Sequence, residues 1–321
     1  MLQTRGGVPA VPARALLSVA AVCIFACLVL LWFIEPRQVA HLVGRLDLVS
    51  LSYVLSLSIG AFGLRFVRWN WLMRRLGYRV PPVRHLLCYV GAFAFSVTPG
   101  QGGELVRGAF LNRHGVRWPD TVAVFVCEKA LDLLAVAMLA TLSFRHALGS
   151  EWYGILAILG VGLIAVAVQK TNLLKWAVRP VEAWIRGKST NGSSYFGAIA
   201  IAGSSLLLPI PLTGGLLIGG VAWSLQGIAL WVLANDLQLE LGLLTAVGIF
   251  GASTLAGAFS FIPGGLGATE GAMATLLVFS GIDVVEAVAL SLLFRVATFW
   301  FAVTLGVLAL TVLGAASRSS S

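Results

Sequence analysis

Long apolar stretches alternate with short basic ones along most of this chain. Apolar runs cover residues 15–34 and 46–64, and similar runs recur as far as residue 313. Each of these two runs is close to the length that a helix needs to cross a bilayer, about 20 residues. The pattern therefore predicts an all-α polytopic membrane protein with about six to eight spans.

Composition supports the same class. Of the 321 residues, 59% are hydrophobic and only 11% are charged, whereas a soluble domain has about 25% charged residues. Because no polar linker separates two bodies, we expect one integral membrane domain over residues 1–321. The net charge of +9 lies in segments between apolar runs, which favours anionic lipid over nucleic acid as the partner.

The basic segments also predict an orientation. Basic residues of membrane proteins stay cytoplasmic, and Trp and Tyr gather at the interface. Six arginines lie within residues 65–84, interleaved with aromatic residues, and a second basic loop covers 169–194. Both segments and both termini should be cytoplasmic in a cell inner membrane, with 120–144 and 152–168 crossing outward and back. We expect segment 195–212, which is apolar but rich in Ser and Pro, to be interfacial or broken rather than a full span.

Two apolar stretches are interrupted by Pro and Gly. Residues 85–97 are too short to cross, and they end in a break at 98–104 before basic residues return. Positive charge on both sides predicts a re-entrant hairpin, which a membrane tolerates only where protein or a wet cavity shields its tip. Residues 241–262 form a second entering helix, which breaks at 263–270. Under the predicted topology, the first hairpin enters from the cytoplasmic side and the second from the outside.

The two breaks resemble each other in sequence. Each has a Gly-Ala-Phe type of run, then Ser, then Pro-Gly, further glycines and a Glu, and Asp132 and Arg295 fall at matching offsets in the spans that follow. Halves 46–144 and 214–313 would then be inverted copies, as in transporters whose substrate site lies near the midplane. The alternative is that Pro-Gly pairs only kink ordinary membrane helices.

Several charges lie at apparent membrane depth, where each costs on the order of 3 kcal/mol if unpaired. They are Glu104, Arg107, Glu128, Lys129, Asp132, Glu270 and Arg295. Glu104 and Arg107 are close enough along a helix to meet, and Arg295 should reach one of the acids. They are either buried ion pairs that fix helix register or the lining of a substrate path.

The glycines of the breaks suit an anionic ligand. Helices starting at Gly103 or Thr269 would point free N–H groups into a cavity, although Glu104 and Glu270 could instead cap those ends. Glycine also lets a head group approach the backbone. The candidate substrate-binding residues are Pro99, Gly100, Gly102, Gly103, Glu104, Arg107, Glu128, Lys129, Asp132, Pro263, Gly264, Gly265, Gly267, Glu270 and Arg295.

No pattern of catalytic or metal-binding residues stands out. The four cysteines lie in apolar runs without a completing ligand set, so we expect small core residues. The four histidines, His41, His85, His114 and His146, should be interfacial. With no P-loop and no nucleophile beside a histidine, we expect no cofactor, no metal and no enzymatic activity.

The segments PGQGGELVRGAFL, EKALDLLAV and PGGLGATEGA, with the late Arg295, resemble the lysylphosphatidylglycerol synthase transmembrane-region family of flippase-like proteins. The resemblance covers residues 46–313. It implies translocation of lipids such as aminoacylated phosphatidylglycerol, polyprenyl-linked sugars or hopanoids. The family usually has Glu-Arg where this chain has Glu128-Lys129. The bidentate hydrogen bonding that an arginine would offer at the second position is therefore not expected of Lys129. We expect no soluble aminoacyltransferase domain of the kind that the full synthases carry, so the resemblance does not imply lipid synthesis.

We therefore expect a lipid translocase. Arg107, Lys129 and Arg295 would hold an anionic head group, and the segments 99–104 and 263–270 would form the two halves of a gate. The alternatives are an intramembrane lipid-modifying enzyme and an accessory partner of a lipid or glycolipid glycosyltransferase.

Overall fold

A computed structural model describes residues 46–144 and 208–318, with Gly44 and short helical pieces between 198 and 206. The predicted spans 15–34 and 152–168, the basic loop 169–194 and seven of the eighteen residues of 195–212 lie outside the described residues. Every regular element within the described ranges is helical, so the all-α prediction is confirmed for this part of the chain.

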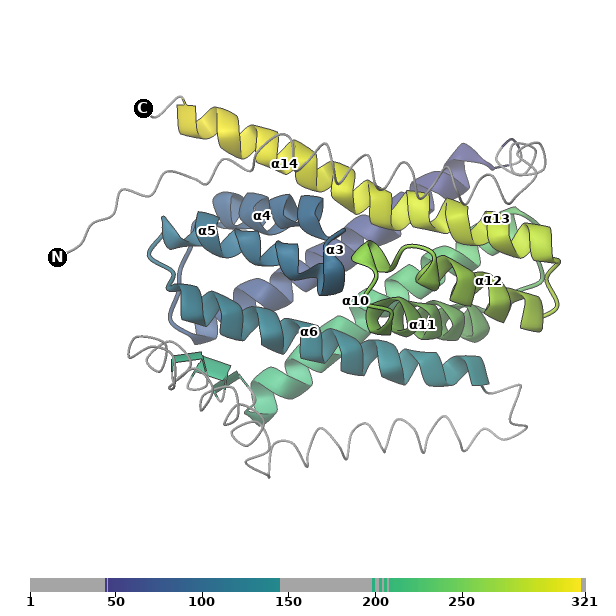
Figure 1. The fold of residues 1–321 in the computed structure, drawn as a ribbon, viewed down its shortest axis with the longest axis horizontal. Helices are drawn as coiled ribbons and strands as arrows, with labels where there is room; N and C mark the ends of the chain where they lie inside the picture. The colour runs from purple at the N-terminus through teal and green to yellow at the C-terminus, as the bar shows by residue number, and fades with distance from the viewer. Residues whose placement is uncertain are drawn as a thin grey trace.

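Two long helices, α3 (Leu48–Arg75) and α10 (Pro209–Asp236), pack along each other through the centre of the molecule (Figure 1). Asp236 ties their ends together, because its carboxylate accepts hydrogen bonds from Asp47 N at 3.0 Å and Ser50 Oγ at 2.7 Å. On α10, Gly219 lies against the Arg68 guanidinium, where a Cβ atom would collide with it. Because Gly219 has no side chain, Arg68 of α3 fits between the two helices.

Two helical hairpins approach the centre from opposite ends (Figure 1). The first consists of α4 (Pro82–Gly91), η1 (Ala92–Phe95), η2 (Pro99–Val106) and α5 (Arg107–Asn112). The second consists of α11 (Leu243–Phe259), η4 (Pro263–Gly265) and α12 (Ala268–Phe279). Their tips meet, since η2 contacts η4. Both helical breaks fall where the Pro-Gly pairs predict them.

A long helix follows each hairpin. The first is α6 (Trp118–Ala140), which continues into η3 (Thr141–Phe144), and the second runs through α13 (Val284–Arg295), the π-helical turn η5 (Val296–Trp300) and α14 (Phe301–Arg318). Helix α6 packs against α11, and α14 packs against α4 and η1. Each of these helices therefore contacts the entering helix of the other hairpin.

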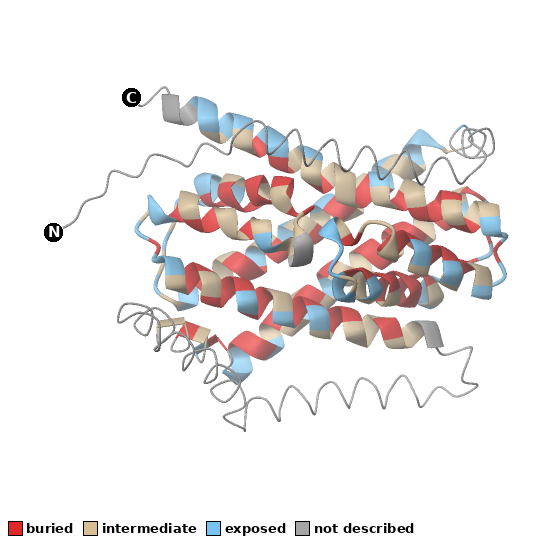
Figure 2. Cartoon of the chain, viewed as in Figure 1, coloured by how far each residue is buried: buried red, intermediate tan, exposed pale blue. Residues whose placement is uncertain are grey.

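Three helices in the described ranges are long and apolar enough to cross a membrane: Leu48–Arg75, Pro209–Asp236 and Val284–Ala315. Many of their large apolar side chains face outward, while buried residues concentrate between helices (Figure 2). This distribution is typical of a protein surrounded by lipid. The total of six to eight spans stays a prediction.

Helix α3 corrects the predicted end of the second apolar run. It continues 11 residues beyond Leu64 to Arg75, so Arg65 and Arg68 belong to a helix face and not to a basic loop. They are 7% and 0% exposed, whereas Arg74 and Arg75 are exposed at the helix end. The prediction is wrong for the first two arginines because carboxylates on α6 offset their charge.

The structure confirms the prediction for the described cysteines and corrects the prediction for one of the described histidines. Cys88 and Cys127 are buried free thiols, as predicted. His85 is buried, not interfacial, because Trp69 donates a 2.9 Å hydrogen bond to its Nε2 and Asn70 Oδ1 lies 3.1 Å from Nδ1. His114 lies in the loop before α6, where partial burial and nearby arginines lower its pKa.

Candidate functional site

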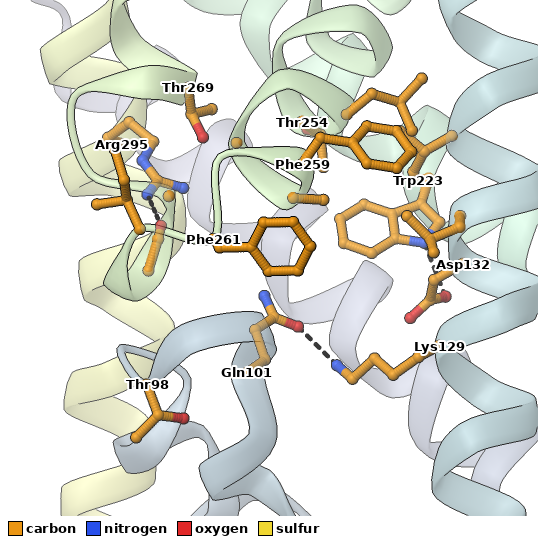
Figure 3. Close-up of a pocket in the computed structure, with 18 residues that line it drawn as sticks. Thr98, Gln101, Lys129, Asp132, Trp223, Thr254, Phe259, Phe261, Thr269 and Arg295 are labelled. Carbon is orange, nitrogen blue, oxygen red and sulfur yellow. Dashed lines mark hydrogen bonds between the residues drawn. The ribbon is translucent and has the colours of Figure 1, made fainter. Parts of the chain in front are cut away.

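A cavity of about 280 Å³ lies where the two hairpin tips meet α6, α10 and α13 (Figure 3). Its polar lining comprises Thr98, Gln101, Lys129, Asp132, Thr254, Thr269 and Arg295, together with the indole of Trp223. Its apolar lining includes Phe259 and Phe261, which lie just before the second break. The cavity therefore combines charged and apolar walls, and both hairpins contribute to it.

Lys129 connects α6 to the tip of the first hairpin. Its ammonium donates hydrogen bonds to Gln101 Oε1 at 2.6 Å and to Glu104 Oε2 at 2.9 Å. Glu104 also accepts a 2.6 Å hydrogen bond from Ser96 Oγ. The side chain of Lys129 is 19% exposed, against 2% for Glu104, so the cation faces the cavity while its carboxylate partner lies behind it.

Arg295 makes the corresponding hydrogen bonds to the second hairpin. Its Nε donates to Glu270 Oε1 at 2.7 Å and its Nη2 to Gly264 O at 2.6 Å. The guanidinium also lies 4.2 Å from the centre of the Phe299 ring. The predicted ion pair of Arg295 with an intramembrane acid is confirmed. Glu270 accepts a hydrogen bond from Gly267 N at 2.7 Å as well, so the capping alternative also holds for this residue.

These two ion pairs have the same spacing along the chain. Lys129 lies 25 residues after Glu104, and Arg295 lies 25 residues after Glu270. Each pair joins the exit limb of a hairpin to the next helix. Lys129 and Arg295 therefore have the same spacing from their acidic partners, whereas Asp132 pairs with Arg68 of α3. The predicted matching of Asp132 with Arg295 across the two halves stays a prediction.

Asp132 and its partners form the wall between the cavity and α3. Its Oδ1 accepts hydrogen bonds from Arg68 Nη2 at 2.6 Å and Trp223 Nε1 at 2.8 Å. Arg65 Nη2 lies 3.6 Å from its Oδ2, and the Arg65 guanidinium lies 4.8 Å from the centre of the Trp223 ring. Two cations thus compensate Asp132, the one carboxylate among the described residues that line the cavity.

Arg107 and Glu128 lie deeper, outside the cavity. Arg107 Nη2 donates to Glu128 Oε2 at 2.6 Å, and both side chains are fully buried. The indole of Trp69 stacks 3.7 Å from the Arg107 guanidinium, and Tyr89 donates a 2.8 Å hydrogen bond to Glu128. The predicted contact between Glu104 and Arg107 is not formed, because Arg107 turns toward α6 and Glu104 pairs with Lys129.

Charge around the cavity does not cancel. The cluster contains five cations, Arg65, Arg68, Arg107, Lys129 and Arg295, and four carboxylates, Glu104, Glu128, Asp132 and Glu270. Within this cluster of described residues, one positive charge is therefore in excess. In a membrane interior such an excess is costly, and an anionic ligand would offset it.

Both hairpin tips hold a side chain in the left-handed backbone region. Gln101 has φ 55° and Phe261 has φ 54°, and both line the cavity. Residues other than glycine rarely adopt this conformation, because it costs about 1–3 kcal/mol. Those that do adopt it cluster at functional sites. The described ranges contain one further example, Gln238.

Five of the predicted site residues line the cavity, namely Lys129, Asp132, Gly264, Gly265 and Arg295. The others lie beside or behind it, with Pro99, Gly100, Gly102, Gly103 and Glu104 in η2, Arg107 and Glu128 in the buried cluster, and Pro263, Gly267 and Glu270 in the second tip. The predicted set does not include Gln101, Trp223, Phe261 or Arg65, which line the cavity or contact its wall. Gln101 lies inside the predicted break, whereas nothing in the sequence distinguishes Trp223.

The family model and the similar proteins that match this chain are all those of membrane proteins. The family model for the lysylphosphatidylglycerol synthase TM region matches residues 15–306. A UPF0104 membrane protein of Pyrococcus horikoshii is 23% identical over 311 residues, covering 87% of this chain and 91% of its own length. A UPF0104 membrane protein of Methanothermobacter thermautotrophicus is 24% identical over 325 residues, covering 94% of this chain and 95% of its own length.

Proposed function

Since the chain belongs to the lysylphosphatidylglycerol synthase TM-region family of membrane proteins, we propose that it is a lipid translocase that moves an amphiphile between leaflets through this cavity. Membrane lipids are then its partners. The head group would pass between the hairpin tips while the tails stay in the bilayer.

The amphipathic lining of the cavity carries this proposal. Lys129, Arg295 and Gln101 supply polar groups, whereas the Phe259 and Phe261 side chains beside them are 68% and 75% exposed (Figure 3). A water-soluble substrate gains nothing from an apolar edge that opens toward lipid. A lipid needs both environments at once, because its head and its tails prefer different surroundings.

Packing supports an inverted repeat as the framework of the site. Helices α6 and α14 each contact the entering helix of the opposite hairpin, and the pairs Lys129–Glu104 and Arg295–Glu270 occupy equivalent positions. Transporters with inverted repeats place their substrate site where such broken helices meet. The contacts between η2 and η4 fit this arrangement, with the two tips as halves of a gate.

The exposed end of α3 supports a cytoplasmic location for that end. Arg74 and Arg75 are exposed there, and the Arg75 guanidinium lies 5.4 Å from the centre of the Trp71 ring. Basic residues with a neighbouring tryptophan are typical of the cytoplasmic interface. We accordingly propose a cell inner membrane location with cytoplasmic termini.

The proposal is tested by reconstituting the purified protein in liposomes with a fluorescent phosphatidylglycerol or phosphatidic acid and measuring its movement between leaflets by chemical quenching. We expect a rate at least about tenfold above protein-free liposomes, equivalent to about 1.4 kcal/mol of barrier. Phe261→Ser should slow this movement several-fold, because Phe261 lines the cavity edge. Phe279→Ser is the matched control, since Phe279 is 82% exposed and does not line the cavity.

A rate equal to that of protein-free liposomes for both lipids would contradict the translocase proposal. The same preparation separates the alternatives. Chemical conversion of the added lipid would indicate a lipid-modifying enzyme. An accessory subunit for lipid or glycolipid synthesis would neither convert nor move it.

A further inference from the structure

The two hairpin tips, residues 94–103 and 258–267, differ in how far they are buried. When they are aligned on their prolines, Val97 corresponds to Phe261, and Ala94 corresponds to Ala258. Val97 and Ala94 are each 4% exposed, whereas Phe261 is 75% exposed and Ala258 is exposed as well. Phe259 of the second tip is 68% exposed. Protein therefore encloses the start of the first tip, while the start of the second faces the surroundings of the molecule.

Helix α14 covers the first tip. Gly306 of α14 lies directly against the backbone of Ala94, because a Cβ atom at Gly306 would collide with Ala94 N. Gly91 lies against the same helix, with its Cβ position 3.1 Å from Leu310 Cδ2. Contact of backbone with backbone leaves the first tip little room to move, since a close-packed interior yields only slightly.

Helix α6 does not cover the second tip in the same way. It packs against α11 at Gly251, whose Cβ position lies 2.7 Å from Ala140 N. Gly251 lies about three helical turns before Pro263. This close contact therefore covers the entering helix of the second hairpin and not its tip.

The serines just before the two breaks also bond differently. Ser96 Oγ donates a 2.6 Å hydrogen bond to Glu104 Oε1 and so ties the first tip to its returning limb. Ser260 Oγ donates to Gly257 O at 2.7 Å, back along the entering helix, and accepts from Ile262 N at 3.2 Å. The serine of the second tip therefore bonds only to its own side of the break among the described residues.

Arg295 connects the second tip to α13. Its Nη2 donates to Gly264 O at 2.6 Å while its Nε donates to Glu270. The ring of Phe299 adds a contact, 3.0 Å from the Cβ position of Gly264. Both contacts come from side chains, which can rotate. Arg295 also adjoins the π-helical turn η5, whereas Lys129 lies within a regular α-helix. Such turns are rare and are frequent at functional sites.

From these observations we propose that the second hairpin tip is the moving half of the gate, that Arg295 is its latch, and that the first tip stays fixed against α14. This inference rests on the proposed translocase function and says which part of the site moves. Segments with few buried contacts open at a lower cost than close-packed ones. The tip has room to move toward its exposed side, at Phe259 and Phe261 (Figure 3).

Distances between spin labels, measured in liposomes by double electron–electron resonance, test the inference. One label is placed at the exposed Leu48 of α3 and the second at Ile262 of the second tip or Gly102 of the first, in a protein whose native cysteines are replaced. Ile262 and Gly102 are both exposed, so each accepts a label. We expect the Leu48–Ile262 distribution to have two maxima, or to be at least about twice as broad as the single Leu48–Gly102 peak.

Matched double variants test the latch. Glu270→Gln/Arg295→Gln removes the cation together with its carboxylate partner, so the net charge does not change. The population of Leu48–Ile262 distances that departs from the closed structure should rise about tenfold, as loss of a charge-assisted hydrogen bond gives. Glu104→Gln/Lys129→Gln makes the same change at the first hairpin. It should alter neither distribution, because α14 and not the ion pair holds the first tip.

Equal widths for the two label pairs would overturn the inference, as would a first tip that Glu104→Gln/Lys129→Gln loosens as much as the other double variant loosens the second. If a double variant does not fold, the two label pairs without these substitutions still decide. The proposed function fails separately. A moving second tip without lipid movement would contradict translocation alone, and lipid movement with equally mobile tips would contradict the assignment of the gate alone.

Discussion

Replacing Glu128 with leucine is expected to destabilise the protein severely. Glu128 is the carboxylate partner of Arg107 at 2.6 Å, and both side chains are fully buried. Removal of one member of a buried ion pair costs about 3–5 kcal/mol, because the remaining charge has no compensation. Arg107 already has Nε and Nη1 without hydrogen-bond partners among the described residues. We expect the melting temperature in detergent to fall by about 10 °C.

A second substitution should reverse most of this loss. Arg107→Met in the Glu128→Leu background removes the orphaned cation and keeps an apolar side chain against Trp69. Arg68, the other cation near Glu128, retains Asp132 at 2.6 Å. Tyr89→Phe is the control, since it deletes only a neutral donor to Glu128 and should cost about 1 kcal/mol. A Glu128→Leu protein that melts like the unmodified one would show that the pair has no stabilising role.

Gly103→Ala is expected to disrupt the first hairpin tip, whereas Gly102→Ala is not. A Cβ atom at Gly103 would lie 2.7 Å from Thr98 Oγ1 and 2.8 Å from the Phe95 carbonyl oxygen. The same Thr98 hydroxyl accepts the hydrogen bond from Gly103 N at 2.6 Å. Overpacking of this kind costs about 1–3 kcal/mol, so the melting temperature should fall by several degrees and translocation should slow with it.

Gly102 is a matched control because it is the neighbouring glycine in the same turn, and beyond its adjacent backbone no atom of the described residues lies within 4 Å of its Cβ position. The two substitutions add the same methyl group. If they lower the melting temperature equally, close packing of Gly103 does not explain the glycine at that position. If only Gly102→Ala slows translocation, the tip glycines serve ligand approach rather than packing.

Local sequence was sufficient to locate the helical breaks. Proline removes a backbone donor and glycine tolerates positive φ. The pairs Pro99-Gly100 and Pro263-Gly264 therefore predict helix interruptions regardless of how the helices pack together. Both breaks occur, and Gly264, Gly265 and Gly267 do adopt positive φ. The cost of an unpaired charge in lipid likewise predicts that Arg295 finds an acid, and it finds Glu270.

The partners within the charge cluster were not predictable from the sequence. Arg65 and Arg68 continue into a basic segment, so their position favours an interfacial loop. Asp132, which pairs with them, is 64 residues from Arg68 in the chain. Packing of α3 against α6 decides this pairing, and no local pattern encodes it. The same applies to Trp223, whose donor reaches Asp132 from a helix 91 residues further along.

We propose that the two hairpin tips part for a head group to pass, and a reversible disulfide between them provides the decisive test. The Cα atom of Val97 lies 3.5 Å from the Cβ position of Gly264, so Val97→Cys/Gly264→Cys places two thiols across the junction in a protein whose native cysteines are replaced. Each single-cysteine variant is the control for the strain of a side chain at Gly264, where φ is +63°. We predict that oxidation stops lipid movement in liposomes and that a reductant restores it, while the single variants respond to neither. Lipid movement at the same rate in the oxidised and reduced forms, with the disulfide verified by mass spectrometry, would contradict the account.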